Sequence, residues 1–235
     1  MSCIESTASP QRFFVTGTDT DAGKTYCSSA LLRGLRLSGV HCSALKPIAS
    51  GVDPDGLNPD AKALAAETGQ QISLVNPLCY QLPTAPHLAA QALQQPLSLA
   101  NLTELLPQSG SQLELIEGAG GWLLPLNADE YLADWVVQQQ WPVVLVVGVK
   151  LGCLNHSLLT VRELRRAGVP IVGYIANILT PHMHYLQETL EDLQQRLQLP
   201  LLATMPFSPA GADDDLCLQL AAQFRLQLAA TSRLS

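Results

Sequence analysis

The chain has 235 residues, a formal net charge of −7, 47% apolar residues and 14% charged residues. This length suits one α/β core and is short for two, so we expect a single domain at residues 13–235. Residues 1–12 are mostly small and polar, so we expect them to form a flexible tail. The negative charge disfavours a nucleic-acid partner, and the longest apolar run, residues 142–149, is too short to cross a membrane. We therefore expect a soluble, cytoplasmic protein that acts on small molecules.

Short aliphatic runs alternate along the chain with longer segments of helical period. Strands are expected at residues 12–17, 42–47, 112–118, 142–149, 170–177 and 201–206. Helices are expected at residues 24–38, 61–68, around 134, 154–167 and 184–197, with one or two more in residues 83–106 that Pro86 and Pro96 interrupt. This alternation predicts a mostly parallel central sheet flanked by helices, a three-layer α/β sandwich of the P-loop NTPase type. Ligands of such sheets bind beyond the carboxyl ends of the strands.

A phosphate-binding loop is predicted at residues 17–25, GTDTDAGKT, between the first strand and the first helix. In such a loop, backbone N–H groups and the helix N-terminus bind phosphate oxygens. Lys24 would contact the β- and γ-phosphates, and the Thr25 hydroxyl would bind magnesium. The strict pattern GxxxxGK[ST] places glycine where this chain has Thr18, so an incidental Gly-rich turn is the alternative.

Three further polar residues are predicted to meet this loop. Glu117 ends a strand and could bind the same magnesium ion, since magnesium prefers oxygen ligands and shared phosphates. Lys46 ends another strand and could stabilise charge that develops on a transferred phosphoryl group. Asp60 opens a helix, where it is either a metal ligand or a simple N-cap. The glycines of residues 118–121 allow the backbone to approach a ligand closely.

Several motifs together resemble the dethiobiotin synthetase family. They are GTDTDAGKT (17–25), KPIASG (46–51), PDA around Asp60, PTAPH (83–87), EGAGGW (117–122), ADWV (133–136), VVGVKLGCLNH (146–156) and AN at Asn177. The resemblance runs from about residue 13 to about residue 206. EGAGGW and VGVKLGCLNH are specific to this family, whereas many NTPases share a GKT loop.

The resemblance implies an ATP- and Mg²⁺-dependent cyclo-ligase of biotin biosynthesis. Family members convert 7,8-diaminopelargonic acid, carbon dioxide and ATP into dethiobiotin, ADP and phosphate. A carbamate forms on one amine, the γ-phosphate activates it as a mixed anhydride, and the second amine closes the ring. No covalent enzyme nucleophile is needed, so positioning and charge stabilisation are the protein's task. A homodimer with active sites shared across its interface is also implied.

The resemblance also implies roles for individual residues. Magnesium would be bound by Thr25, Asp60 and Glu117. The reacting groups would meet Lys24, Lys46, Thr20 and Ser50. The nucleotide would contact Asp21, Ala22, Gly23, Lys24, Thr25, Tyr26, Glu117, Gly118, Gly120, Asn177 and Pro206, with Asn177 at the adenine edge. The diamine would contact Lys46 and Ser50, and its carboxylate would meet the partner subunit's helix start at Gly152, Cys153, Leu154 and Asn155, with Tyr185 near by.

Some features match the family less well or carry no assigned role. The spacing around Tyr185 differs from the family pattern, and Ala210 stands where an acidic residue near the ribose is expected. His182 and His184 are expected at the surface, and His87 receives no role. The six cysteines form no CxxC pair, which predicts neither a zinc site nor a disulfide framework. Tryptophans 122, 135 and 141 are expected to pack in the core.

Two other functions remain as alternatives at this stage. One is a related amidoligase of the cobyrinate a,c-diamide or cobyric acid synthetase type, although such enzymes normally add a glutaminase domain. The other is a partitioning-type ATPase that acts as a nucleotide-switched binding module. Such ATPases usually carry an extra lysine early in the loop, where this chain has Thr18.

Overall fold

The computed structural model describes residues 10–107 and 109–231. Most of the expected tail, residues 1–9, lies outside this range. The first strand begins at Gln11, one residue before the start that the sequence predicts. None of the helices in the described residues is long and apolar enough to cross a membrane.

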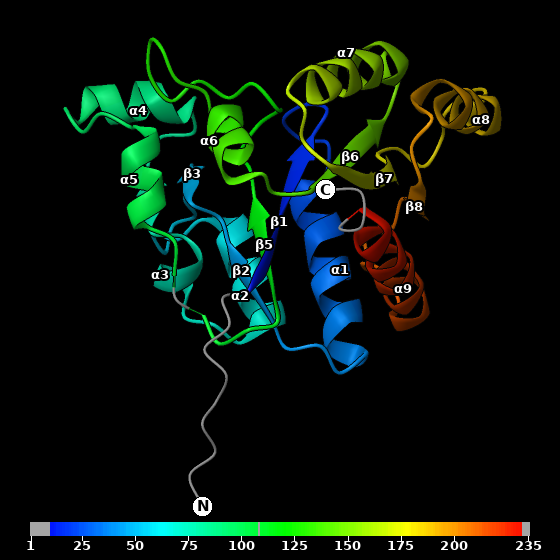
Figure 1. The fold of residues 1–235 in the computed structure, drawn as a ribbon, viewed down its shortest axis with the longest axis horizontal. Helices are drawn as coiled ribbons and strands as arrows, with labels where there is room; N and C mark the ends of the chain where they lie inside the picture. The colour runs from blue at the N-terminus through cyan, green and yellow to red at the C-terminus, as the bar shows by residue number, and fades with distance from the viewer. Residues whose placement is uncertain (1–9, 108, 232–235) are drawn as a thin grey trace, which may run out of the picture.

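A six-stranded parallel sheet forms the centre of the described chain (Figure 1). Its strands are β1 (Gln11–Gly17), β2 (Cys42–Leu45), β5 (Leu113–Glu117), β6 (Val143–Val149), β7 (Ile171–Ile178) and β8 (Leu201–Met205). They lie in the order β2-β5-β1-β6-β7-β8, and every pairing is parallel. Each expected strand overlaps one of these, so the prediction of a mostly parallel sheet is confirmed.

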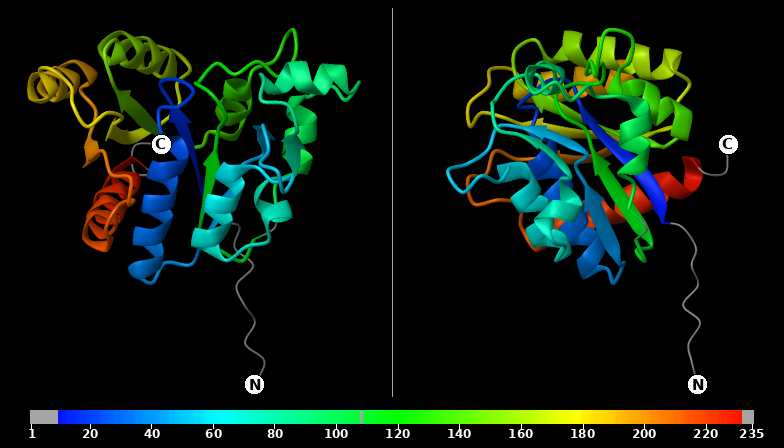
Figure 2. Two further views of the ribbon diagram at one scale, coloured as in Figure 1. Left: turned by 180° about the vertical axis from the view of Figure 1, so that it is seen from behind. Right: turned by 90° about the vertical axis from the view of Figure 1, so that its left-hand side faces the viewer.

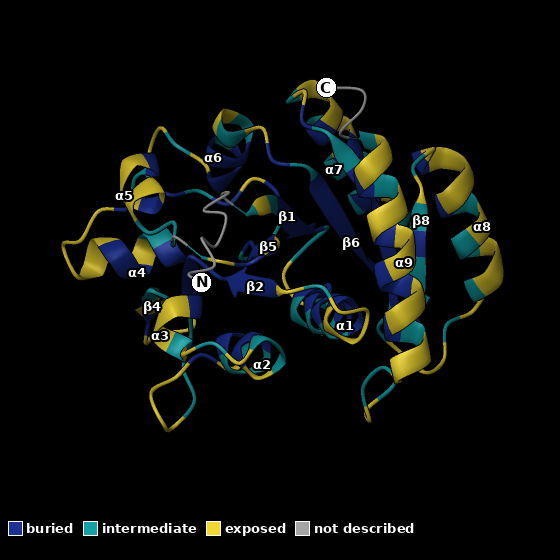
Figure 3. Ribbon diagram, turned by 60° about the horizontal axis from the view of Figure 1, so that its bottom comes forward, coloured by how far each residue is buried: buried dark blue, intermediate teal, exposed yellow. Residues whose placement is uncertain are grey.

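Helices cover both faces of this sheet, which gives the expected three layers (Figure 2). One face is covered by α1 (Lys24–Leu37), α2 (Pro59–Thr68) and α9 (Asp214–Thr231). The other is covered by α4 (Pro86–Ala92), α5 (Leu99–Glu104), α6 (Leu132–Gln139), α7 (Cys153–Arg166) and α8 (Leu186–Leu197). The strands between them are buried (Figure 3).

The central strands contribute to the core on both faces because successive side chains point to opposite sides. In β1, Phe13 and Val15 pack with α1 and α9, whereas Phe14 packs with the opposite layer. The same alternation holds in β6, where Val144 faces the α1 side and Leu145 faces α7 and α8. The tryptophans expected in the core are buried, and Trp135 packs edge-on against Trp141.

The structure differs from the predicted elements at the end of the second strand and in the short elements between residues 48 and 92. The strand expected to reach Pro47 ends at Leu45, and the chain then enters a separate short strand, β3 (Ile48–Ser50), which pairs with β4 (Leu78–Tyr80). A short helix, α3 (Ile72–Val75), precedes β4. Pro86 was expected to break a helix but is the first residue of α4, where its missing N–H costs no hydrogen bond.

The segment after Pro206 forms the long helix α9, which the sequence analysis left unassigned. It packs along α1, and Gly34 allows the two helices to approach closely. A Cβ at position 34 would collide with the backbone of Cys217 in α9. The C-terminal segment therefore completes the layer on the α1 face of the sheet.

Candidate functional site

The phosphate loop connects β1 to α1 at the carboxyl edge of the sheet. Gly23 precedes α1 with φ of 85°, a left-handed conformation that favours glycine. A Cβ at this position would also collide with the amide of Asn177. Asn177 is buried on β7 and donates through Nδ2 to the carbonyl of Ala22 at 3.0 Å. The neighbouring strand thus holds the backbone of the loop in place.

Lys24 is buried at the start of α1 and points along the loop. Its Nζ donates to the carbonyl oxygens of Asp19 at 3.2 Å and Gly120 at 2.6 Å. The pKa of Lys24 is lowered, first by burial and then by the nearby charge of Lys46. The loop thereby places a desolvated ammonium beside the glycine-rich segment that follows β5, as a phosphate-binding lysine requires.

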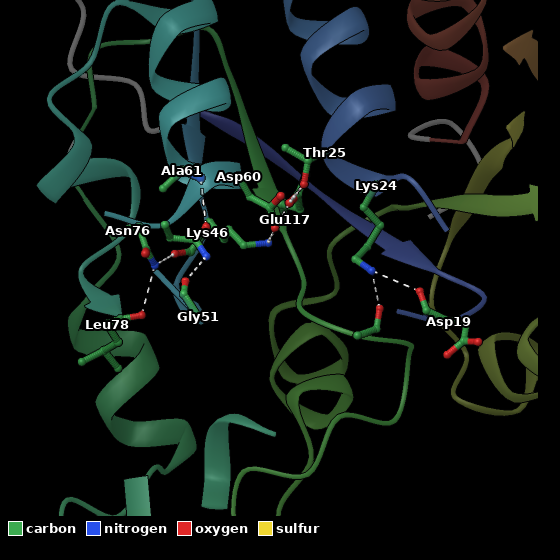
Figure 4. Close-up of polar contacts among 12 residues, drawn as sticks. Asp19, Lys24, Thr25, Lys46, Gly51, Asp60, Ala61, Asn76, Leu78 and Glu117 are labelled. Atoms are coloured by element: carbon green, nitrogen blue, oxygen red, sulfur yellow. Dashed lines mark hydrogen bonds and ion pairs between the residues drawn. The ribbon is translucent and has the colours of Figure 1, made fainter. Parts of the chain in front are cut away.

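A cluster of one hydroxyl and three charged side chains lies next to the loop, formed by Thr25, Lys46, Asp60 and Glu117 (Figure 4). Glu117 is fully buried at the end of β5. Its Oε1 accepts hydrogen bonds from the Thr25 hydroxyl and from Lys46 Nζ, both at 2.8 Å. Lys46 Nζ also lies 3.1 Å from Asp60 Oδ2. Residues from four separate segments therefore meet at one point, as the sequence predicts for Lys46 and Glu117.

Opposite charges in the cluster favour the ionised forms of Lys46 and Asp60. Burial alone would lower the pKa of Lys46, but the Glu117 and Asp60 carboxylates outweigh it and raise that pKa. Burial would raise the pKa of Asp60, yet the neighbouring Lys46 ammonium holds that pKa below its ordinary value. The cluster is thus a buried ammonium between two carboxylates.

Two asparagines that the sequence analysis missed position this cluster. Asn76 donates through Nδ2 to the carbonyl of Lys46 at 2.7 Å and to that of Leu78 at 3.0 Å. Asn58 caps α2 by accepting from the N–H of Ala61 at 3.1 Å. The alternative of Asp60 as the N-cap is therefore wrong, because Asn58 fills that position. No local sequence signal distinguishes Asn76, and only its contacts reveal its part.

The cluster and the loop border a pocket of about 820 Å³. Predicted site residues that line it are Thr20, Asp21, Gly23, Lys24, Thr25, Tyr26, Lys46, Ser50, Asp60 and Gly120. The wall opposite the loop is formed in part by Asp53, Pro83 and Thr84, to which the sequence analysis gave no role. The first four residues of the motif PTAPH, residues 83–86, therefore line the pocket, and their place in a family motif could have suggested this.

Other predicted site residues lie outside the walls of this pocket. Ala22, Gly118 and Asn177 are buried behind the loop and support it. The residues that remain apart from it are Pro206, Gly152, Cys153, Leu154, Asn155 and Tyr185. Of these, Gly152 immediately precedes α7, and Tyr185 is 77% exposed. Within one copy of the chain, the helix start at Gly152 does not contribute to the pocket.

The donor set in the cluster fits a magnesium ion. Glu117 Oε2 is buried and has no hydrogen-bond partner, which leaves an acceptor for a cation. Thr25 and Asp60 add oxygen atoms beside it. In the described residues, no three His, Cys, Asp or Glu side chains gather as a metal site. Magnesium is usually held by one or two carboxylates together with phosphate and water oxygens, and Glu117 and Asp60 supply two carboxylates.

Comparison with known proteins agrees with this geometry. A family model described as an AAA domain matches residues 11–213. The chain is 44% identical over 211 residues to the ATP-dependent dethiobiotin synthetase BioD of Aeromonas hydrophila, covering 86% of this chain and 93% of that protein. It is 39% identical over 223 residues to the BioD of Vibrio vulnificus, covering 92% of this chain and 98% of that protein.

Solved structures show the same fold at low sequence identity. The cell division ATPase MinD of Pyrococcus furiosus is 18% identical with a TM-score of 0.53, over 92% of this chain and 99% of that one. A ParA family ATPase of Chlorobium tepidum is 16% identical with a TM-score of 0.50, over 96% and 95% of the two chains. At this identity the likeness concerns the fold alone. The sequence matches over most of the chain, however, show that it belongs to the ATP-dependent dethiobiotin synthetase family.

Proposed function

We propose that this chain uses ATP to close the cyclic urea of dethiobiotin on 7,8-diaminopelargonic acid and carbon dioxide. Family membership supports the reaction class, an ATP-dependent ligase of biotin biosynthesis. The observation that carries the proposal is one pocket in which the phosphate loop meets Lys46 and Asp60, with Glu117 buried against Lys46 and Thr25. Its volume of about 820 Å³ accommodates a triphosphate and a small diamine side by side.

The chain's own residues would bind and orient the reactants. Lys24 and the loop N–H groups would hold the terminal phosphates, because both lie at the N-terminus of α1. Lys46 would stabilise charge on the carbamate and on the phosphoryl group during transfer. Ser50, at the end of β3, would orient the diamine from the opposite wall of the pocket. Thr20 and Asp21 line the pocket on the loop side.

Magnesium would be held by Thr25, Asp60 and Glu117, and it would neutralise charge on the phosphate groups of ATP. The reaction needs no covalent nucleophile, since ATP itself activates the carbamate. The protein contributes proximity and preorganised charge, which fits a pocket bordered by two lysines. Asn177 and Pro206 remain the candidates for contacts with the base.

We further propose a homodimer in which each copy completes the other's pocket. The helix start at residues 152–155 lies apart from the pocket of its own chain, yet the N-terminus of a helix suits a carboxylate. Leu151 beside it is 96% exposed, which is costly for a large apolar side chain unless another surface covers it. A second copy would cover Leu151 and present this helix start to the diamine carboxylate.

One assay tests the proposed reaction. Purified protein is incubated with ATP, Mg²⁺, bicarbonate and the diamine, and the product is followed by mass spectrometry together with phosphate release. Dethiobiotin formation with one phosphate released per ring supports the proposal. Phosphate release that ignores the diamine, with no ring product, would instead fit a nucleotide-switched ATPase and overturn it.

The dimer has its own test. Leu151→Glu is expected to shift the chain toward a monomer in analytical ultracentrifugation and to raise the KM for the diamine. Leu226→Glu is the matched control, because Leu226 is also exposed, at 62%, but lies on α9. A monomeric wild-type chain with full activity would rule out a shared site.

A further inference from the structure

Lys46 occupies the space between the carboxylates that would bind magnesium. Its Nζ lies 2.8 Å from Glu117 Oε1 and 3.1 Å from Asp60 Oδ2. The Thr25 hydroxyl donates to the same Glu117 oxygen at 2.8 Å. Each of the three expected metal-binding side chains therefore has a partner within the cluster, and Glu117 Oε2 is the oxygen among them that is buried without one.

We propose that Lys46 acts as a placeholder cation, which prevents a divalent ion from binding these carboxylates until a nucleotide supplies its phosphates. The inference rests on the proposed function only in taking Thr25, Asp60 and Glu117 as the metal ligands. It adds an order of events: metal and nucleotide enter together, and the same step frees the lysine for the reacting groups.

The charges of the cluster explain this order. The ammonium and a divalent ion that shared the same two carboxylates would repel each other, because Lys46 and Glu117 are withdrawn from water even though Asp60 is half-exposed. Lys46 is 3% exposed and Glu117 is fully buried, so solvent screens this repulsion poorly. The phosphates of a nucleotide bring negative charge that gives Lys46 a new partner and also contributes ligands to the metal.

The backbone around Lys46 is held by hydrogen bonds, so only the side chain is free to move when metal and nucleotide bind. The N–H of Lys46 donates to the carbonyl of Val75 at 2.6 Å, and its own carbonyl accepts from Asn76 Nδ2 at 2.7 Å. With the main chain held on both sides, exchange of partners takes place by rotation of the lysine side chain within the pocket. This is a motion of one side chain, and it requires no movement of β2 or β3.

Manganese binding to the full-length chain tests the inference, with free Mn²⁺ measured by electron paramagnetic resonance. For the wild type, Mn²⁺ is expected to bind at least tenfold more weakly to the nucleotide-free protein than to its complex with ADP. Lys46→Met removes the placeholder charge and is expected to bind Mn²⁺ without nucleotide at least tenfold more tightly than the wild type. Lys46→Arg keeps the charge, so its affinity for Mn²⁺ without nucleotide should remain as low as that of the wild type.

Two further variants secure the interpretation. Adding Glu117→Gln to Lys46→Met should abolish the gained binding, which shows that the ion occupies this cluster. Lys46→Gln replaces Lys46→Met if the latter does not fold, as judged by circular dichroism. Wild-type protein that binds Mn²⁺ equally well with and without ADP would overturn the inference, as would a folded neutral variant at position 46 with unchanged affinity.

Parallel assays of ring closure separate this inference from the proposed function. A wild type that forms dethiobiotin but binds Mn²⁺ tightly without nucleotide would overturn the placeholder role alone. A wild type that forms no ring product, together with a Lys46→Met variant that gains Mn²⁺ binding without nucleotide, would overturn the proposed reaction and support the placeholder role.

Discussion

The two carboxylate oxygens of Glu117 have different surroundings. Oε1 accepts from Thr25 and Lys46, whereas Oε2 is buried without a hydrogen-bond partner. A buried carboxylate oxygen left in this way is costly unless a cation or an ordered water approaches it. A single glutamate thus joins the phosphate loop on α1 to the lysine that follows β2, and it keeps one oxygen for a ligand.

Replacing Thr25 with valine tests this arrangement at one side chain. Thr25→Val keeps the shape but removes the hydroxyl that donates to Glu117, so we expect a loss of about 1 kcal/mol in the free energy of unfolding. The apparent affinity for Mg²⁺ in the presence of ATP should fall by roughly 10- to 100-fold. Chemical denaturation and Mg²⁺ titration of turnover measure the two effects.

The control for this variant is Thr68→Val at the end of α2. The Thr68 hydroxyl donates to the carbonyl of Leu64 at 3.0 Å within its own helix. This variant should leave the Mg²⁺ dependence unchanged. Equal Mg²⁺ titrations for the wild type and Thr25→Val would remove Thr25 from the metal site.

At the level of elements, the N-terminus of α2 determines where Asp60 lies. Asn58 caps the helix, Pro59 occupies its first position, and Asp60 follows with its carboxylate toward Lys46. Asn58 Nδ2 also donates to the carbonyl of Gly51 at 2.9 Å, which links the helix to the end of β3. One buried side chain therefore connects two walls of the pocket.

We predict that Asn58→Ala lowers both stability and nucleotide affinity. Loss of an N-cap costs about 1 to 2 kcal/mol, and release of the Gly51 carbonyl shifts Asp60 away from Lys46. The matched control is Ser98→Ala, since Ser98 caps α5 by accepting from Asn101 N–H at 3.2 Å far from the pocket. Thermal unfolding should show a lower stability for both variants. Calorimetric titration with Mg²⁺ and ATP should show weaker nucleotide binding only for Asn58→Ala.

The contact between α1 and α9 depends on a glycine within a helix. Alanine normally favours a helix over glycine by about 1 kcal/mol. At Gly34 the added methyl would collide with the backbone of Cys217, so we expect Gly34→Ala to destabilise the chain by about 1 to 3 kcal/mol. Ser29→Ala on the same helix is the control, because it removes a buried hydroxyl without a partner and should be neutral or stabilising. Urea unfolding compares the free energies of unfolding of the two variants. A Gly34→Ala variant more stable than the wild type would show that α1 and α9 can move apart without loss of stability.

For the molecule as a whole, the sequence predicts the elements of the central sheet and the residues at their carboxyl ends. Aliphatic runs flanked by glycine or proline mark β1, β5 and β6, and parallel pairing then brings the phosphate loop to Glu117. The small sheet of β3 and β4 was missed because each strand has three residues, too few to show a period. Asn76 was missed because its role depends on a contact with Lys46 across 30 positions.

A buried ion pair joins neighbouring strands at the amino ends of the sheet, away from the pocket. It has no part in the proposed reaction. Arg12 on β1 donates through Nε to Glu114 Oε2 at 2.6 Å, and the two residues are in register between β1 and β5. Arg12 also donates to the carbonyl of Pro107 at 2.9 Å. Glu114 is fully buried, and Ser43 on β2 donates to its other oxygen at 3.2 Å. Three strands and a connecting segment therefore meet at one carboxylate.

Breaking the buried Arg12–Glu114 pair should lower the free energy of unfolding by more than breaking an ion pair at the surface. Arg12→Ala leaves the Glu114 carboxylate buried without its charge partner, a change that typically costs about 3 to 5 kcal/mol. Arg196→Ala on α8 breaks an exposed pair with Asp192 and should cost about 0.3 to 0.5 kcal/mol. Because the pair lies at the amino ends of the strands, the KM for ATP should change little in either variant at temperatures where both remain folded. Chemical denaturation compares the free energies of unfolding of the two variants. Equal losses of stability would mean that water reaches Glu114 and replaces the arginine.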